Sequence, residues 1–125
     1  EGDATLRSFM NWNELDSLEQ TKEILNHWQQ IGTFRNDHPA IGAGIHKVIA
    51  KVPYVFSRYL NKDEFVDKVV IALDLPKGKK TISVKGVFGD GTKLYDQYSE
   101  TESTVTNGKV VLENDFDMVL LELKK

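Results

Sequence analysis

The sequence predicts a mainly β protein, an antiparallel β-sandwich of about eight strands with a Greek-key tendency, preceded by one amphipathic α-helix. Three observations support this fold class. Only the segment 17–36 repeats its apolar residues with helical spacing. From Gly44 onward, apolar residues alternate with polar ones or form short β-branched runs. Turn-forming residues separate these runs, and a chain of strands without intervening helices favours antiparallel sheets packed face to face.

The predicted helix begins at residue 17, where Asp16 or Ser17 can serve as its N-cap. Its apolar residues recur every three or four positions and form one stripe. The stripe comprises Ile24, Leu25, Trp28, Ile31 and Phe34. The helix must end before Pro39, because the proline ring disfavours helical geometry at His38.

The predicted strands cover 45–51, 53–60, 65–74, 80–86, 92–96, 103–106, 109–113 and 118–123. The loops at 61–64 and 76–79 suit short hairpins, and the Gly-Asp-Gly of 89–91 tolerates positive φ. Asn107-Gly108 is the strongest hairpin signal in the chain. The strands on either side of it are therefore expected to pair with each other.

Composition and charge exclude several classes of protein. With 40% hydrophobic and 28% charged residues, the composition is that of an ordinary globular domain. A net charge of −3 gives no electrostatic reason to expect nucleic acid or an anionic membrane as partner. The chain has no cysteine, hence neither disulfides nor thiolate metal sites. It shows no apolar run of transmembrane length and no signal-peptide pattern, and its start without Met suggests a fragment.

The charge distribution predicts a domain boundary near Pro39. Residues 1–39 hold seven acidic and three basic side chains, whereas residues 40–125 hold 12 acidic and 13 basic ones. The local pattern changes from helix to strand at the same place. We therefore divide the chain into 1–39 and 40–125.

Four stretches carry a resemblance to a known family. They are "GDATLRSFMNW", "IGTFRNDHPAIGAG", "YVFSRY" and "KVVIALD". Together they resemble the C-terminal part of alpha-amylase-type glycoside hydrolases. In that family a (β/α)8 barrel ends in a helix whose tail reads arginine, two variable residues and His-Pro, as Arg35, His38 and Pro39 do here. A β-sandwich called domain C follows directly.

The first strands of domain C often carry an aromatic-x-Phe-x-Arg pattern, which Tyr54, Phe56 and Arg58 match. The next hydrophobic strand commonly ends in Asn, and Asp74 departs from this. The resemblance implies that residues 1–39 are the remnant of a catalytic barrel including its last helix, and that 40–125 are domain C.

The resemblance also implies a function. The chain would be the non-catalytic C-terminal domain of a retaining hydrolase of starch-type α-glucans or related oligosaccharides, and it would stabilise the barrel. The family's catalytic carboxylates and its Asn-His-Asp motif are absent, since 36–38 reads Asn-Asp-His, so this chain is not expected to be an enzyme. The alternatives are an α-glucan-binding module and an unrelated immunoglobulin-like interaction domain.

The partners implied are the barrel of the same protein and, for the alternative, an α-glucan. No cofactor is expected in this fragment, although the family often binds calcium in its catalytic part. Export to the periplasm or the exterior suits the family, and a cytoplasmic location stays open.

Few side chains are candidates for a site. Tyr95, Tyr98 and Trp12 are candidates for stacking on sugar rings, the two tyrosines because they lie beside a polar loop. The spacing of His27, His38 and His46 does not suit a metal site. A basic cluster is expected to be a solvated hairpin. It comprises Lys77, Lys79 and Lys80.

Overall fold

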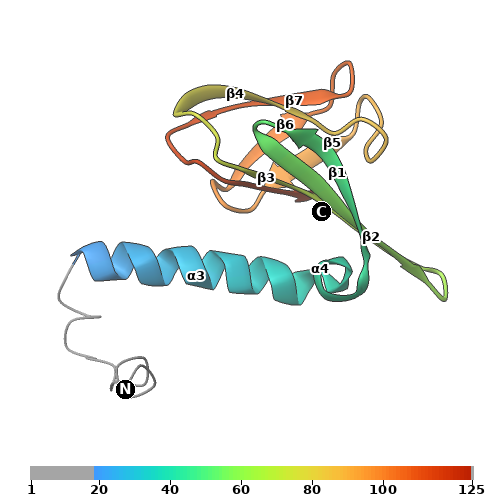
Figure 1. Ribbon diagram of the computed structural model, residues 1–125, viewed down its shortest axis with the longest axis horizontal. Coiled ribbons are helices and arrows are strands. Elements are labelled where there is room, and N and C mark those ends of the chain that lie inside the picture. Colours follow the sequence, from blue (N-terminus) through green and yellow to red (C-terminus); the bar gives the residue numbers. More distant parts are fainter. Residues whose placement is uncertain (1–18, 125) are drawn as a thin grey trace.

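The computed structural model describes residues 19–124, and Trp12 and the predicted N-caps Asp16 and Ser17 lie outside this range. Figure 1 shows a long helix beneath a set of strands, joined to them by one short helical turn. The elements are α3 (Glu19–Asp37), α4 (Pro39–Ala43), β1 (Ile45–Lys51), β2 (Tyr54–Lys62), β3 (Phe65–Leu73), β4 (Gly78–Ser83), β5 (Lys93–Asp96), β6 (Thr101–Thr104), β7 (Lys109–Asn114) and β8 (Val119–Leu123).

The strands form two antiparallel sheets, which confirms the predicted fold class. The large sheet has six strands in the order β1-β2-β3-β8-β5-β6, and the small sheet pairs β4 with β7. The main core lies between the sheets. It includes Val55, Val70, Ile82, Leu94, Val110 and Leu121.

Strand β3 is buried on both of its faces. Val70 and Ala72 point into the main core, whereas Val69 and Ile71 point outward and pack in a second cluster with Phe34 of α3. Because successive side chains of a strand alternate between faces, burial on both sides requires a continuous apolar run. This explains the sequence "VVIAL" at 69–73.

The predicted hairpin at 76–79 is wrong, and the predicted hairpin at Asn107-Gly108 forms only at its tip. Asn107 and Gly108 do form a tight turn with φ of 53° and 74°, and Thr106 and Lys109 exchange both backbone hydrogen bonds across it. The flanking strands then separate, because β6 pairs with β5 and β7 pairs with β4. The loop at 76–79 likewise joins strands of different sheets, whereas 61–64 closes the β2–β3 hairpin as predicted.

The junction between helix and sandwich is short. Helix α3 ends at Asp37, before Pro39 as predicted, and Pro39 then occupies the start of α4. Gly44 ends this turn and begins the strands. A Cβ atom on Gly44 would lie 2.5 Å from the carbonyl oxygen of Ala40, so only glycine fits this close approach.

Candidate functional site

Helix α3 carries apolar side chains in two directions. Phe34 is buried against Val69, Ile71 and Leu120 of the large sheet. Three others are exposed, with Ile24 at 55%, Leu25 at 41% and Trp28 at 63%. The predicted helical spacing is correct, but the stripe divides between a packed end and an uncovered part. We call Ile24, Leu25 and Trp28 the outer face of α3.

Polar contacts hold the middle of α3 on the sandwich. His27 Nδ1 lies within hydrogen-bond distance of the Tyr98 hydroxyl, and Gln30 Nε2 donates to the Tyr98 carbonyl oxygen at 2.9 Å. Partial burial raises the pKa of Tyr98, and the carboxylates of Asp117 and Asp96 add to the effect. The hydroxyl therefore stays protonated at neutral pH and is able to donate to His27.

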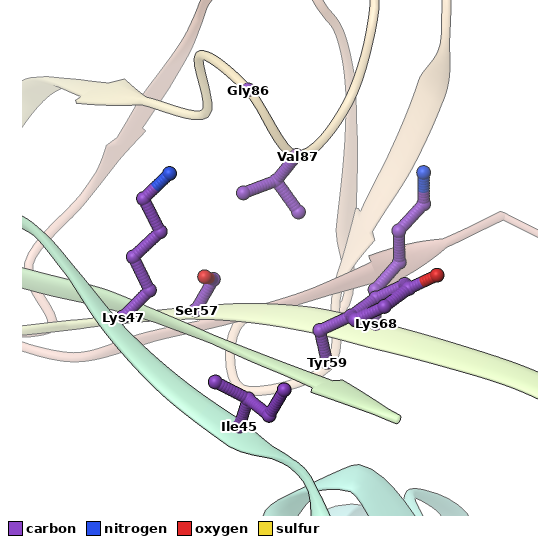
Figure 2. A pocket seen from close by; sticks show the side chains of 7 residues that line it. All are labelled: Ile45, Lys47, Ser57, Tyr59, Lys68, Gly86 and Val87. Carbon is purple, nitrogen blue, oxygen red and sulfur yellow. The ribbon is translucent and has the colours of Figure 1, made fainter. Parts of the chain in front are cut away.

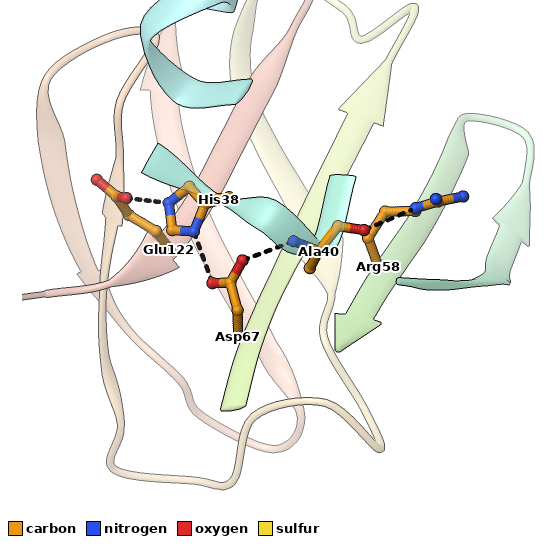
Figure 3. A network of polar contacts seen from close by, with 5 residues as sticks. All are labelled: His38, Ala40, Arg58, Asp67 and Glu122. Atoms are coloured by element: carbon orange, nitrogen blue, oxygen red, sulfur yellow. Dashed lines mark hydrogen bonds and ion pairs between the residues drawn. The ribbon is translucent and has the colours of Figure 1, made fainter. Parts of the chain in front are cut away.

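A buried polar cluster joins the end of α3 to the large sheet (Figure 3). The two ring nitrogens of His38 face different carboxylates: Nδ1 lies 2.8 Å from Asp67 of β3, and Nε2 contacts Glu122 of β8. The other oxygen of Asp67 accepts from the backbone N–H of Ala40 at 2.9 Å. Arg58 Nε donates to the Ala40 carbonyl oxygen at 3.2 Å. We call His38, Asp67 and Glu122 the junction triad.

The geometry of the junction triad suits a structural role. A neutral imidazole donates from one nitrogen only, so acceptors at both nitrogens of His38 fit the doubly protonated ring. Such a ring supplies a positive charge between two buried carboxylates. Neither nitrogen of His38 is left for a substrate or a nucleophile, unlike the histidine of a hydrolytic triad.

The triad was not predicted from the sequence. His38 is separated from Asp67 by 29 positions and from Glu122 by 84. The available signal is a lone carboxylate within an apolar strand, as Glu122 is in "VLLEL" of 119–123. Such a residue faces a buried surface and requires a partner. It does not indicate which partner.

A polar groove lies between α3 and the sandwich. It has a volume of about 690 Å³ and is lined by amide, carboxyl, hydroxyl, imidazole and ammonium side chains together with two aromatic rings. The rings of Tyr98 and Phe116 meet edge to face, with centroids 5.2 Å apart. The lining includes Asn26, His27, Gln30, Ser99, Glu100 and Asp115. We call this cavity the Tyr98 groove.

The predicted stacking residues do not share one surface. Tyr98 is half-buried and lines the Tyr98 groove, whereas Tyr95 of β5 lines a separate cavity of about 250 Å³ with Glu122 and Lys124. Trp12 lies outside the described residues. The role of these three in binding sugar stays a prediction.

The prediction of a solvated lysine cluster is wrong for Lys80. This side chain is only 3% exposed, and its ammonium donates to Asn114 Oδ1 at 2.8 Å and to the Phe116 carbonyl oxygen. Strand alternation places Lys80 on the same face as the buried Ile82, so its aliphatic part packs inside and its charge requires fixed acceptors. Lys77 and Lys79 are exposed as expected.

The histidines lie on separate elements, His27 on α3, His38 before α4, and His46 on β1, where it stacks on Phe56. Within residues 19–124, no group of three or more His, Asp or Glu side chains has the arrangement of a metal site. Neither α3 nor α4 combines the length and the apolarity that crossing a lipid bilayer requires.

No protein-family model matches the sequence, and no curated protein matches it significantly. Solved structures do match it. An Anoxybacillus alpha-amylase gives a TM-score of 0.61 at 18% identity over 83% of this chain. AmyP in complex with maltose gives 0.65 at 18% identity over 88% of this chain. An AmyP variant in complex with maltotriose gives 0.63 at 15% identity over 94% of this chain.

The matched region is a small part of each of these proteins. It spans 23% of the Anoxybacillus alpha-amylase chain, and 22% and 24% of the two AmyP chains. The TM-scores of 0.61 to 0.65 indicate a shared fold, although the identities are low. The described chain thus has a fold that also occurs within enzymes of the alpha-amylase family.

Proposed function

We propose that the chain is the non-catalytic C-terminal part of an alpha-amylase-like retaining glycoside hydrolase that acts on starch-type α-glucans or related oligosaccharides. Its role is to stabilise the catalytic barrel, with 1–39 as the end of that barrel and 40–125 as domain C. The observation that carries the proposal is the outer face of α3, where Ile24, Leu25 and Trp28 are exposed beside a well-packed sandwich.

A covered outer face would contribute substantially to stability. Fully burying a large apolar side chain is worth about 1.5–3 kcal/mol. Because these three side chains are already about half covered, covering the rest would contribute about 2–5 kcal/mol. A barrel that packs against α3 supplies this cover in the same polypeptide. The fold of this chain is similar to a region that makes up about a quarter of alpha-amylase-family enzymes. This similarity supports the same interpretation.

The buried carboxylates of the described residues suit this non-catalytic role. Asp67 and Glu122 are engaged by His38, and Asp96 accepts hydrogen bonds from backbone N–H groups. A retaining glycosidase needs two carboxyl groups free to face the scissile bond. In the proposed enzyme these groups belong to the barrel.

The proposal is tested by placing Trp28→Lys in two contexts. The substitution should lower the melting temperature of the chain extended upstream by its barrel, because it places a charge in an apolar interface. It should leave the melting temperature of the 125-residue chain unchanged, because Trp28 is exposed there. Gln29→Lys is the matched control and should have no effect in either context. An unchanged melting temperature of the extended protein with Trp28→Lys would refute the docking of α3.

A second candidate function, α-glucan binding, is favoured by the Tyr98 groove. Sugar hydroxyls need many hydrogen-bonding partners, and this groove combines amide and carboxyl side chains with the rings of Tyr98 and Phe116. AmyP, whose fold is similar over this region, forms a complex with maltose.

Titration with maltoheptaose, followed by NMR chemical shifts, tests this second candidate. If the groove binds the sugar, resonances of Tyr98 and Phe116 should shift at millimolar ligand. Phe116→Ala should weaken the response. Phe65→Ala, at a similarly exposed ring on β3, should not. Absence of any shift would eliminate glucan binding at this groove.

A further inference from the structure

A separate cavity of about 370 Å³ opens at one end of the sandwich. It lies on the inner face of β1, β2 and β3, under the loop that carries Gly86 and Val87 (Figure 2). Six of its lining residues offer side chains to a ligand: Ile45, Lys47, Ser57, Tyr59, Lys68 and Val87. We call this space the end cavity.

The end cavity continues the main core along the same strand faces. On β2, Val55 lies in the core, and the residues that follow on that face are Ser57 and Tyr59. On β3, Val70 lies in the core, and Lys68 precedes it on the same face. Core positions thus give way to a polar and partly open surface, beyond the part that the small sheet covers.

The walls of the cavity are apolar and uncovered. Ile45 and Tyr59 are paired neighbours on β1 and β2, and they are 71% and 40% exposed. Val87 faces them from the loop (Figure 2). Three apolar surfaces around one opening fit the hydrophobic body of a small ligand, and the volume is in the range of small-molecule pockets.

The charge of the cavity is entirely positive. Lys47 and Lys68 both point toward the loop of Val87 (Figure 2), and no carboxyl group lines the space. The ammonium of Lys68 lies 5.1 Å from the ring centroid of Phe88, which holds it near the opening. Among the described residues, neither lysine forms an ion pair. Two uncompensated ammonium groups beside an apolar wall favour an anionic ligand.

The lining also distinguishes this site from the Tyr98 groove. That groove offers amide and carboxyl acceptors for sugar hydroxyls, whereas the end cavity offers only the hydroxyls of Ser57 and Tyr59 besides its two lysines. A neutral sugar would leave most of its hydroxyls unpaired in the end cavity. An organic anion with an apolar body has no such hydroxyls, and its charged group can pair with a lysine.

We propose that the end cavity binds a small organic carboxylate with an aromatic or short aliphatic body. Lys47 and Lys68, which flank Val87 from opposite sides in Figure 2, attract the carboxylate, and the body packs against Ile45, Tyr59 and Val87. This inference does not depend on the proposed role beside a catalytic barrel, since none of these residues belongs to α3.

Three probes test the two parts of the proposal by NMR titration of the 125-residue chain. Phenylacetate carries both the charge and the ring, phenylacetamide carries the ring without the charge, and acetate carries the charge without the ring. Phenylacetate should shift the Val87 methyl and Tyr59 ring resonances. It should bind about tenfold or more tightly than either other probe, which corresponds to one lost charge-assisted contact or one lost apolar contact.

Substitutions of the lysines complete the test. Lys47→Gln and Lys68→Gln should each lower the affinity for phenylacetate about five- to tenfold. Lys79→Gln, at an exposed lysine of β4 outside the cavity, is the matched control and should leave binding unchanged. Lys47 and Lys79 are exposed and Lys68 is half-buried, and amide spectra of the three variants should show an intact fold.

Four results would overturn the proposal. Equal binding of phenylacetamide would refute the role of charge, and equal binding of acetate would refute the apolar wall. If Lys79→Gln lowered the affinity for phenylacetate as much as Lys47→Gln does, the anion would be attracted to the protein's positive charges in general and not to this cavity. Absence of shifts at Val87 and Tyr59 with millimolar phenylacetate would refute the site itself.

Discussion

His38 is the single side chain that most directly ties the helical segment to the sandwich. It lies between Asp67 of β3 and Glu122 of β8, and all three are at most 9% exposed. His38→Ala removes the imidazole that contacts both carboxyl groups and leaves them buried without this partner. Breaking a buried ion pair in this way costs about 3–5 kcal/mol. We therefore expect the free energy of unfolding, measured by urea denaturation, to fall by about 3 kcal/mol or more.

The control for this prediction is His46→Ala. His46 is exposed on β1, where it stacks on Phe56 and has no carboxylate partner among the described residues. Its removal should cost less than about 1 kcal/mol. Similar losses for the two histidines would mean that the charge of His38 is not what holds the junction.

Asp96 gives a prediction about pH. It is fully buried, and the backbone N–H groups of Tyr98, Ser99 and Leu120 donate to it. Burial raises its pKa above the ordinary 3.8, and the hydrogen bonds offset only part of this effect. A carboxyl group whose pKa is higher in the folded state stabilises the fold below pH 3.8, and that contribution is lost as pH rises through the folded pKa.

Asp96→Asn removes this titrating group, so the stability of the variant lacks the pH-dependent contribution of residue 96. The difference in unfolding free energy between the natural chain and the variant should be largest below pH 3.8 and should shrink above it. Urea denaturation across this pH range measures it. The other carboxyl groups are common to both proteins and largely cancel. A difference that grows with pH would contradict the raised pKa.

Single residues also mark the limit of what the sequence predicts. The proline after His38 correctly predicts where α3 ends, because that effect acts between neighbours. The contacts of His38 and Lys80 depend on strands far away in the chain. Local patterns contain no information about which distant strand becomes a neighbour. The junction triad and the buried lysine were missed for this reason.

At the scale of elements, the strands were predicted well and their pairing less so. Period-two alternation predicted 45–51 as a strand, and β1 has these same bounds. Turn chemistry correctly predicted the bend at Asn107-Gly108. Sheet membership is decided by which side chains reach the core, and Val110 and Leu112 of β7 do so opposite the large sheet. A turn signal alone does not specify this.

The β2–β3 hairpin offers a test at this scale. Its turn residues Asp63 and Glu64 have φ of 51° and 68°, a conformation that costs a residue with a side chain about 1–2 kcal/mol. Glu64→Gly relieves part of this strain and should raise the free energy of unfolding by about 0.5–1 kcal/mol. Lys62→Gly, two residues earlier in β2, should lower it by a similar amount. Urea denaturation that shows losses for both variants would contradict the strain argument.

At the scale of the whole molecule, the division into 1–39 and 40–125 stays a prediction. The described part of 1–39 nevertheless packs on the sandwich through Phe34, His27 and Gln30. The charge balance and the pattern of apolar residues thus change near Pro39, at a short connection inside one packed unit. A boundary predicted from sequence does not tell whether the two sides contact each other.

A shortened chain of residues 40–125 tests how strongly the two parts depend on each other. Without α3 and the residue that follows it, Val69, Ile71 and Leu120 lose the cover of Phe34, and Asp67 and Glu122 lose His38. Burial of Phe34 alone is worth about 1.5–3 kcal/mol, and in a domain of this size each kcal/mol corresponds to about 4–8 °C. We expect the melting temperature, followed by circular dichroism, to fall by about 10 °C or more.

Single substitutions on α3 separate packing from the mere presence of the helix. Phe34→Ala in the full chain should reproduce much of the fall, because it removes the anchor of α3 on β3 and β8. Trp28→Ala changes a similarly large side chain on the same helix, but one that is exposed, and should leave the melting temperature nearly unchanged. If the shortened chain had the same melting temperature as the full chain, α3 would contribute nothing to the stability of the sandwich. In that case its position would be set only by whatever covers the outer face.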